Sequence, residues 1–159
     1  MTDFSAILRA LDSARVEYIL LGGAAATVHG SARLTLDIDV VYRRTPENLA
    51  RLAEGLQPHK PYLRGAPPGL PFAWDAETLR RGLNFPLITA LGPIDLLGEI
   101  TGAGTYEQLL PDTVVVSAFG VSCRCITLER LIQVKRAAGR VKDLDAIAEL
   151  EALLEERGD

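Results

Sequence analysis

Apolar and polar residues alternate with two different periods along the chain. Between residues 3 and 14 the apolar positions fall at helical spacing, which predicts an amphipathic helix. The next segment, 16–21, is apolar almost throughout, as expected for a strand covered on both faces. The same criteria predict further helices over 24–28, 46–56, 76–81, 106–110, 128–138 and 141–155, and strands over 36–42, 84–90, 93–97, 113–117 and 121–126.

Helices and strands thus alternate, and the pattern predicts an α/β (α+β) protein with a mixed β-sheet flanked by helices. Capping residues support the helix starts: Thr45 precedes Pro46, and Asp75 and Thr127 precede the next predicted helices. Gly82 and Gly139 are placed to end two of them. At 159 residues we expect one domain, 1–159, with the C-terminal helices at about 127–156 packed on the core.

Composition narrows the class of protein. Hydrophobic residues make up 48% and charged residues 24%, and no apolar run approaches the roughly 20 residues that span a bilayer. The first nine residues do not have the pattern of a signal peptide, so we expect a cytoplasmic protein without a membrane partner. A net charge of -4 gives no overall attraction to nucleic acid, although a local basic face stays open.

The two cysteines, Cys123 and Cys125, lie two apart in a predicted strand. An extended backbone between them does not favour a disulfide, and two thiols without a further ligand make a poor zinc site. We expect them to serve strand packing.

The segment from Tyr18 to Val41 carries the candidate chemistry. Its first strand ends at Gly22-Gly23, and its second carries Asp37 and Asp39, which share one face if both lie in the strand. Two adjacent carboxylates repel unless a cation lies between them. Glycine lets backbone N–H groups approach a ligand closely. Together these features predict a metal-nucleotide site.

A third carboxylate, Asp95, lies in the apolar segment PIDLL. Charged residues are rarely buried without a partner, so Asp95 either has a counterion or a hydrogen-bonding role, or faces solvent on an edge strand. Glu99 is the fallback candidate for this third carboxylate of the site. Three carboxylates suit two Mg²⁺ ions, which prefer oxygen ligands and require no His or Cys.

The string GGAAATVHGSARLTLDIDV, with a later Asp95, resembles the nucleotidyltransferase superfamily that shares the catalytic core of DNA polymerase β. Together with LIQVKRAAGRVKDLDAI, it is similar to the bacterial AbiEii-type nucleotidyltransferases, over about residues 16–150. The resemblance implies the nucleotidyltransferase fold. It also implies that Gly22 and Gly23 contact nucleotide phosphates, that Asp37 and Asp39 bind both metals, and that Asp95 completes the catalytic metal site.

The resemblance extends to the cations. It implies that Lys135 lies near the triphosphate, with Arg140, Lys142 and Asp143 in the rest of that motif, and that Arg33 matches the arginine before the two aspartates. The C-terminal cations could instead form a solvated helix face. Many members have Gly-Ser where this chain has Gly23-Ala24, which removes a hydroxyl from the phosphate turn. We interpret His29 as a hydrogen-bonded packing residue rather than a base.

The implied activity is Mg²⁺-dependent transfer of a nucleoside monophosphate from an NTP to a hydroxyl-bearing acceptor, with release of pyrophosphate. The acceptor could be RNA, a protein or an aminoglycoside-like small molecule. The alternative is a nucleotide-binding or toxin-antitoxin partner-binding module of the same fold that catalyses little. A homodimer or a partner chain could then supply a missing wall of the site.

Five of the nine prolines fall between Pro58 and Pro71, which predicts a long, stiff loop without periodicity. Tyr62, Arg64, Phe72 and Trp74 lie in or beside it. The segment could form a wall of the acceptor pocket, or it could wrap the core and bury its aromatic residues.

Overall fold

The computed structural model describes residues 2–158 and contains a seven-stranded mixed sheet in the order β3-β4-β5-β2-β1-β7-β6. The pairs β1/β7 and β2/β5 are parallel, and the other neighbours are antiparallel. The strands are β1 (Tyr18–Leu21), β2 (Ile38–Tyr42), β3 (Tyr62–Leu63), β4 (Phe85–Thr89), β5 (Gly92–Leu97), β6 (Thr113–Ala118) and β7 (Val121–Ile126).

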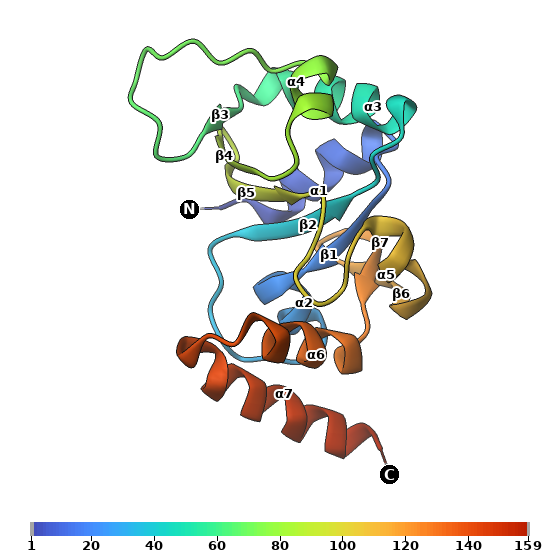
Figure 1. The fold of residues 1–159 in the computed structure, drawn as a ribbon. Coiled ribbons are helices and arrows are strands. Elements are labelled where there is room, and N and C mark those ends of the chain that lie inside the picture. Colours follow the sequence, from blue (N-terminus) through green and yellow to red (C-terminus); the bar gives the residue numbers. More distant parts are fainter. Residues whose placement is uncertain (1, 159) are drawn as a thin grey trace.

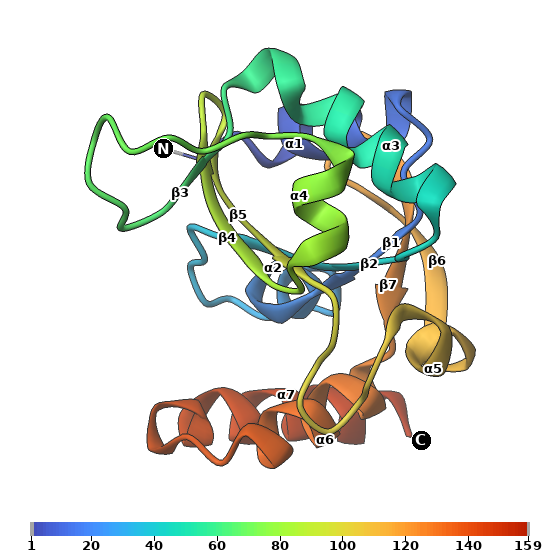
Figure 2. The ribbon, with the colours of Figure 1, turned by 45° about the horizontal axis from the view of Figure 1, so that its top comes forward.

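Helices cover both faces of this sheet (Figures 1 and 2). On one side lie α1 (Phe4–Ser13), α3 (Pro46–Leu56) and α4 (Ala76–Arg81), and on the other α2 (Gly22–Val28), α6 (Leu128–Ala138) and α7 (Leu144–Arg157). The short α5 (Tyr106–Leu109) precedes the β6/β7 hairpin. Short 3-10 turns occupy Gln57–His59, Leu110–Asp112 and Val141–Asp143.

The central strands are buried on both faces, which explains why their sequences are nearly continuous apolar runs. All four residues of β1 are buried, and in β2 only Asp39 is partly exposed. Fully burying a Leu or Ile side chain contributes roughly 1.5–3 kcal/mol, so this layer is a major source of stability. The predicted fold class, a mixed sheet flanked by helices, is confirmed.

Several helix boundaries follow the sequence signals closely. Thr45, Asp75 and Thr127 cap α3, α4 and α6, each accepting a hydrogen bond from a backbone N–H three residues on. Gly139 ends α6 in the left-handed conformation at φ 65°. Both cysteines are free and buried in β7, as expected from their spacing.

Several boundaries differ from the prediction, and the segment 58–71 contains β3 rather than being a loop throughout. Strand β2 begins at Ile38, which pairs with Ile94 of β5, so Asp37 lies just before the strand. Helix α2 starts at Gly22 directly after β1, without the glycine turn that we expected to precede it. The last helix is divided, since residues 141–143 form a 3-10 turn before α7.

The C-terminal helix is attached to the core by polar contacts around α2. His29 is buried, with Nε2 lying 2.6 Å from the Ile126 carbonyl oxygen and Nδ1 lying 3.1 Å from an Arg157 nitrogen. The Ser31 hydroxyl donates to Glu149 at 2.6 Å. The expectation that His29 is a hydrogen-bonded packing residue is confirmed.

None of the helices within residues 2–158 combines the length and the apolar character needed to cross a membrane.

Asn48 is the polar link between α3 and the central strands. Its side chain is fully buried: Oδ1 accepts from the Glu17 N–H at 2.7 Å, and Nδ2 donates to the carbonyls of Glu17 and Arg43. These bonds join the start of β1 to the end of β2.

We therefore expect Asn48→Ala to lower the free energy of unfolding by about 2–4 kcal/mol, because it leaves buried backbone groups without partners. Urea denaturation measures this change. Gln57→Ala, an exposed position at the end of α3, is the control and should change stability by less than about 0.5 kcal/mol. Equal effects of the two variants would contradict the role assigned to Asn48.

Candidate functional site

Two of the three carboxylates, Asp39 and Asp95, are neighbours across the sheet. In the parallel pair β2/β5, Asp39 lies opposite Asp95, and on the other side of β2 the same Asp39 lies opposite Leu21, the last residue of β1. Asp37 lies just before β2, where its carbonyl accepts from the Thr35 hydroxyl at 3.2 Å. This register places Asp95 beside Asp39, and Asp37 lines the same cavity as both.

The three carboxylates influence one another. The pKa of Asp39 is raised to about 7, first by burial, then by the neighbouring Asp95 carboxyl and by the charge of Asp37. Lys135 acts in the opposite direction. Two like charges this close favour a shared proton or a bound cation over full ionisation. The register of β2 and β5 therefore places two carboxylates side by side, where a nearby positive charge stabilises their ionised forms.

Gly22 is required by its contact with Asp39. Its φ is +60°, and a Cβ at this position would overlap Oδ2 of Asp39. At Gly23 a Cβ would lie 2.5 Å from the Thr35 hydroxyl oxygen. Both glycines therefore leave room for side chains of the following loop and strand. Gly22 also lines the cavity beside the carboxylates, whereas Gly23 is absent from its lining.

The cations come from the end of α6 and the turn that follows it. Lys135 is largely buried, with Nζ 3.8 Å from Oδ1 of Asp143. Arg140 donates from Nε to the other oxygen of Asp143 at 2.6 Å. Asp143 is itself buried, so it holds the two cations together. The alternative of a solvated helix face is wrong for Lys135, because only 15% of its side chain is exposed. It holds for Arg136, Arg140 and Lys142, which are exposed.

A cavity of about 600 Å³ brings these groups together. This volume is within the range of small-molecule sites. Its apolar wall comes mainly from β1, β5, β7 and α6. Its polar lining consists of Gly22, Asp37, Asp39, Asn84, Asp95, Glu99, Thr101, Lys135, Arg140 and Lys142.

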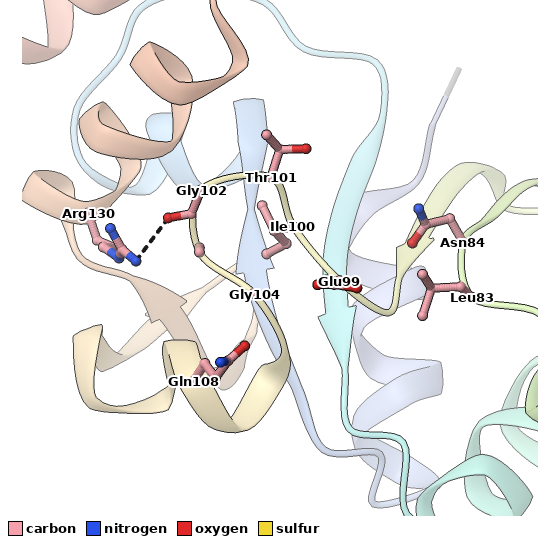
Figure 3. Close-up of a pocket in the computed structure, with 10 residues that line it drawn as sticks. Leu83, Asn84, Glu99, Ile100, Thr101, Gly102, Gly104, Gln108 and Arg130 are labelled. Atoms are coloured by element: carbon pink, nitrogen blue, oxygen red, sulfur yellow. Dashed lines mark hydrogen bonds between the residues drawn. The ribbon is translucent and has the colours of Figure 1, made fainter.

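A second cavity of about 710 Å³ shares Asn84, Glu99, Ile100 and Thr101 with the first. Figure 3 shows the segment from Glu99 to Gly104 between Asn84 on one side and Gln108 and Arg130 on the other. Arg130 donates to the Gly102 carbonyl at 3.1 Å, which fixes part of this segment. Glu99, the fallback candidate, thus lies where the two cavities meet.

Not every residue singled out from the sequence reaches the cavity. Arg33 lies against α7, 3.6 Å from Glu149, with half of its side chain exposed. Asn84 and Thr101, which sequence reasoning missed, do line the cavity. Asn84 precedes β4, and its side-chain oxygen accepts from the Gly98 N–H at 2.9 Å. No local signal marks it, since the contact joins residues 14 apart in the chain.

Asp95 has a counterion. Nη1 of Arg64 lies 3.1 Å from Oδ1 of Asp95, and β5 is an interior strand between β4 and β2. The alternative of an edge-strand Asp facing solvent is therefore wrong. The proline-rich segment contributes Arg64, while Trp74 donates to the Ala53 carbonyl at 2.9 Å and packs against the core. It thus both covers the core and contacts the third carboxylate.

The donor chemistry of the cavity fits Mg²⁺ in kind, because carboxylate oxygens are its preferred protein ligands. The pKa of Asp39 is raised, and a bound cation would lower it again by favouring the ionised carboxylate. Within residues 2–158, however, no three His, Cys, Asp or Glu side chains are grouped as a complete metal-ligand set. Asp95 has one carboxylate oxygen 3.1 Å from Nη1 of Arg64.

No protein-family model matches the chain, and no curated protein matches it. Among solved structures, the chain is similar to the crystal structure of a putative nucleotidyltransferase from Thermotoga maritima. The TM-score is 0.54 at 14% sequence identity, and the alignment covers 94% of each chain. The likeness establishes that this chain has the nucleotidyltransferase fold.

The contact between Gly22 and Asp39 leads to a prediction about stability. We expect Gly22→Ala to destabilise the protein by more than Gly65→Ala, which serves as the matched control. Both positions have positive φ, but nothing lies within 4 Å of a Cβ at Gly65. The control should lose about 1–2 kcal/mol from backbone strain alone, and Gly22→Ala at least about 1 kcal/mol more. Equal losses in urea denaturation would show that Asp39 moves aside freely.

The raised pKa of Asp39 leads to a second prediction. Between pH 4 and 7 the folded state holds a proton on Asp39 that the unfolded state has lost, so this group makes stability fall as pH rises through that window. Asp39→Asn removes the effect. Relative to wild type, the variant should therefore gain at least about 1 kcal/mol between pH 4 and pH 8 in the absence of metal.

Thermal unfolding at several pH values measures this difference. Asp12→Asn, an exposed carboxylate on α1, is the control for removing one negative charge. A difference between Asp39→Asn and wild type that stays constant with pH would contradict the assigned environment of Asp39.

Proposed function

We propose that this protein is a Mg²⁺-dependent nucleotidyltransferase that transfers a nucleoside monophosphate from an NTP to a hydroxyl-bearing acceptor and releases pyrophosphate. The observation that carries the proposal is the cavity that Asp37, Asp39 and Asp95 line together with Lys135 and Arg140. Carboxylates and cations in one cavity suit a triphosphate bound through metal ions.

In this proposal Asp37 and Asp39 hold two Mg²⁺ ions, and Asp95 completes the catalytic metal site. When bound, the ions neutralise the triphosphate and polarise the phosphorus that is attacked. Lys135, Arg140 and Lys142 bind the phosphate oxygens from the α6 side. Gly22 contributes its backbone N–H at the start of α2, where no side chain caps the helix.

Asp95 is also the group proposed to receive the proton of the acceptor hydroxyl. Its position supports this role, because it lies beside Asp39 on one side and contacts Arg64 of the proline-rich segment on the other. The acceptor hydroxyl would lose its proton as its oxygen bonds to the α-phosphorus, and the bond from that phosphorus to pyrophosphate would break. The acceptor is proposed to be RNA, a protein or an aminoglycoside-like molecule, and the finer relationship to AbiEii-type proteins is part of the same proposal.

A second candidate function is a partner-binding module of the same fold with little catalysis. It is favoured by exposed apolar residues next in sequence to residues that line the cavity. Leu36 is 60% exposed beside Asp37, and Val141 is 82% exposed between Arg140 and Lys142. Exposed apolar groups near a charged site suit a protein partner or a second copy of the chain.

Thermal unfolding with each NTP, with and without Mg²⁺, separates the two functions. For the enzyme, an NTP at 100 times its Kd should stabilise the protein by about 2.7 kcal/mol, and only with Mg²⁺ present. The double variant Asp37→Ala/Asp39→Ala should lose this response, while Asp12→Ala should keep it.

The absence of any NTP response in the wild type would contradict the enzyme and leave the binding module. Incubating the wild type with labelled NTPs and separate pools of RNA, protein and aminoglycosides then tests transfer itself, because only a true acceptor becomes labelled.

A further inference from the structure

One row of residues crosses the sheet at the site. Leu21 in β1 pairs with Asp39, Asp39 with Asp95, and Asp95 with Pro86 in β4. The row ends with Arg64, whose backbone N–H donates to the Pro86 carbonyl at 2.9 Å. Arg64 follows β3 directly and lies within the proline-rich segment 58–71.

The Arg64 side chain extends back across this row toward the carboxylates. Nη1 lies 3.1 Å from Oδ1 of Asp95, and Nη2 donates to the Leu87 carbonyl at 2.9 Å. The guanidinium is thus fixed at two points, one on the acidic residue and one on the backbone of β4. Two fixed points define the orientation of a planar guanidinium far better than one.

Stability alone is a weak reason for this pair. About a third of the Arg64 side chain and a quarter of the Asp95 side chain are exposed, and partly exposed ion pairs contribute little to folding. The pair does have a local consequence. Asp95 has the like charge of Asp39 on one side and the guanidinium of Arg64 on the other. When no other cation is near, attraction to Arg64 therefore sets the orientation of the Asp95 carboxylate.

We propose that Arg64 is a positioning residue that acts through Asp95: it is the internal counterion of that carboxylate, and it competes with a divalent cation for it. This inference rests on the proposed function, because it concerns the third carboxylate of the same site. It also connects the metal site to the proline-rich segment, since binding of a cation to Asp95 would release the Arg64 guanidinium, which belongs to that segment.

The proposal makes opposite predictions for metal affinity and for turnover. Arg64→Ala removes a competing positive charge, so it should bind Mn²⁺ about three- to tenfold more tightly than wild type in the absence of NTP. The same variant leaves Asp95 without its orienting partner, so kcat should fall about tenfold or more while the KM for NTP changes less than about twofold. A merely structural role would not strengthen metal binding.

Arg64→Lys separates charge from orientation. It keeps the positive charge but cannot make both contacts at once, so its Mn²⁺ affinity should stay near wild type and its kcat should lie between the other two proteins. Arg43→Ala is the matched control. Arg43 pairs with Glu17 at 2.8 Å with similar exposure, at the end of β2 away from the carboxylates, and its loss should change neither quantity.

Electron paramagnetic resonance of Mn²⁺ titrated into the full-length protein measures the affinities. In an Asp95→Asn background, Arg64→Ala should change the affinity less than about twofold, because Arg64 acts through Asp95. Unchanged Mn²⁺ affinity in Arg64→Ala, or an equal gain with and without Asp95, would overturn the inference while leaving the proposed function intact. A wild type that binds neither Mn²⁺ nor NTP would overturn both.

Discussion

The parallel register of β2 and β5 is the constraint on which the site depends. It places Asp39 and Asp95 in neighbouring positions across the sheet, where a change of register by one residue would turn one of them to the opposite face. The register is in turn fixed by apolar residues, because Ile38, Val40, Ile94 and Leu96 are fully buried next to the two aspartates. The packing of the core thus forces two like charges together, and the surroundings must accommodate them.

Three residues from distant parts of the chain accommodate the two neighbouring carboxylates. Gly22 leaves the space that the Asp39 carboxylate occupies, Lys135 brings a cation from α6, and Arg64 brings another from the opposite edge of the sheet. Asp143 holds Lys135 and Arg140 in place. Each is attached to a rigid element or to a buried partner, which keeps the cavity open and its charges fixed.

Local patterns predicted much of this fold. The capped helices and the apolar strands follow from residues close together in sequence, and so does the pair Asp37 and Asp39. What local patterns could not provide is pairing between distant segments. The contact of Arg64 with Asp95 spans 31 residues, and that of Arg33 with Glu149 spans 116. For the same reason Asp37 was predicted to lie in the strand, although β2 begins at Ile38 opposite Ile94 of β5 and its pairing with β1 begins only at Asp39.

The place of the site follows from where the strands end. At Leu21 the chain leaves β1 and turns at once into α2, and β2 begins only one residue before Asp39. Beyond this point β2 has no partner on the β1 side, and Leu21, Gly22 and Asp39 line the cavity at this end of the sheet. Side chains at such an end are held by the sheet but still reach an open cavity. The interior of β2 could not offer this, because Val40 and Val41 are buried on both faces. The second residue of β2 is therefore the position in this strand where a carboxylate is both rigidly held and accessible to a ligand.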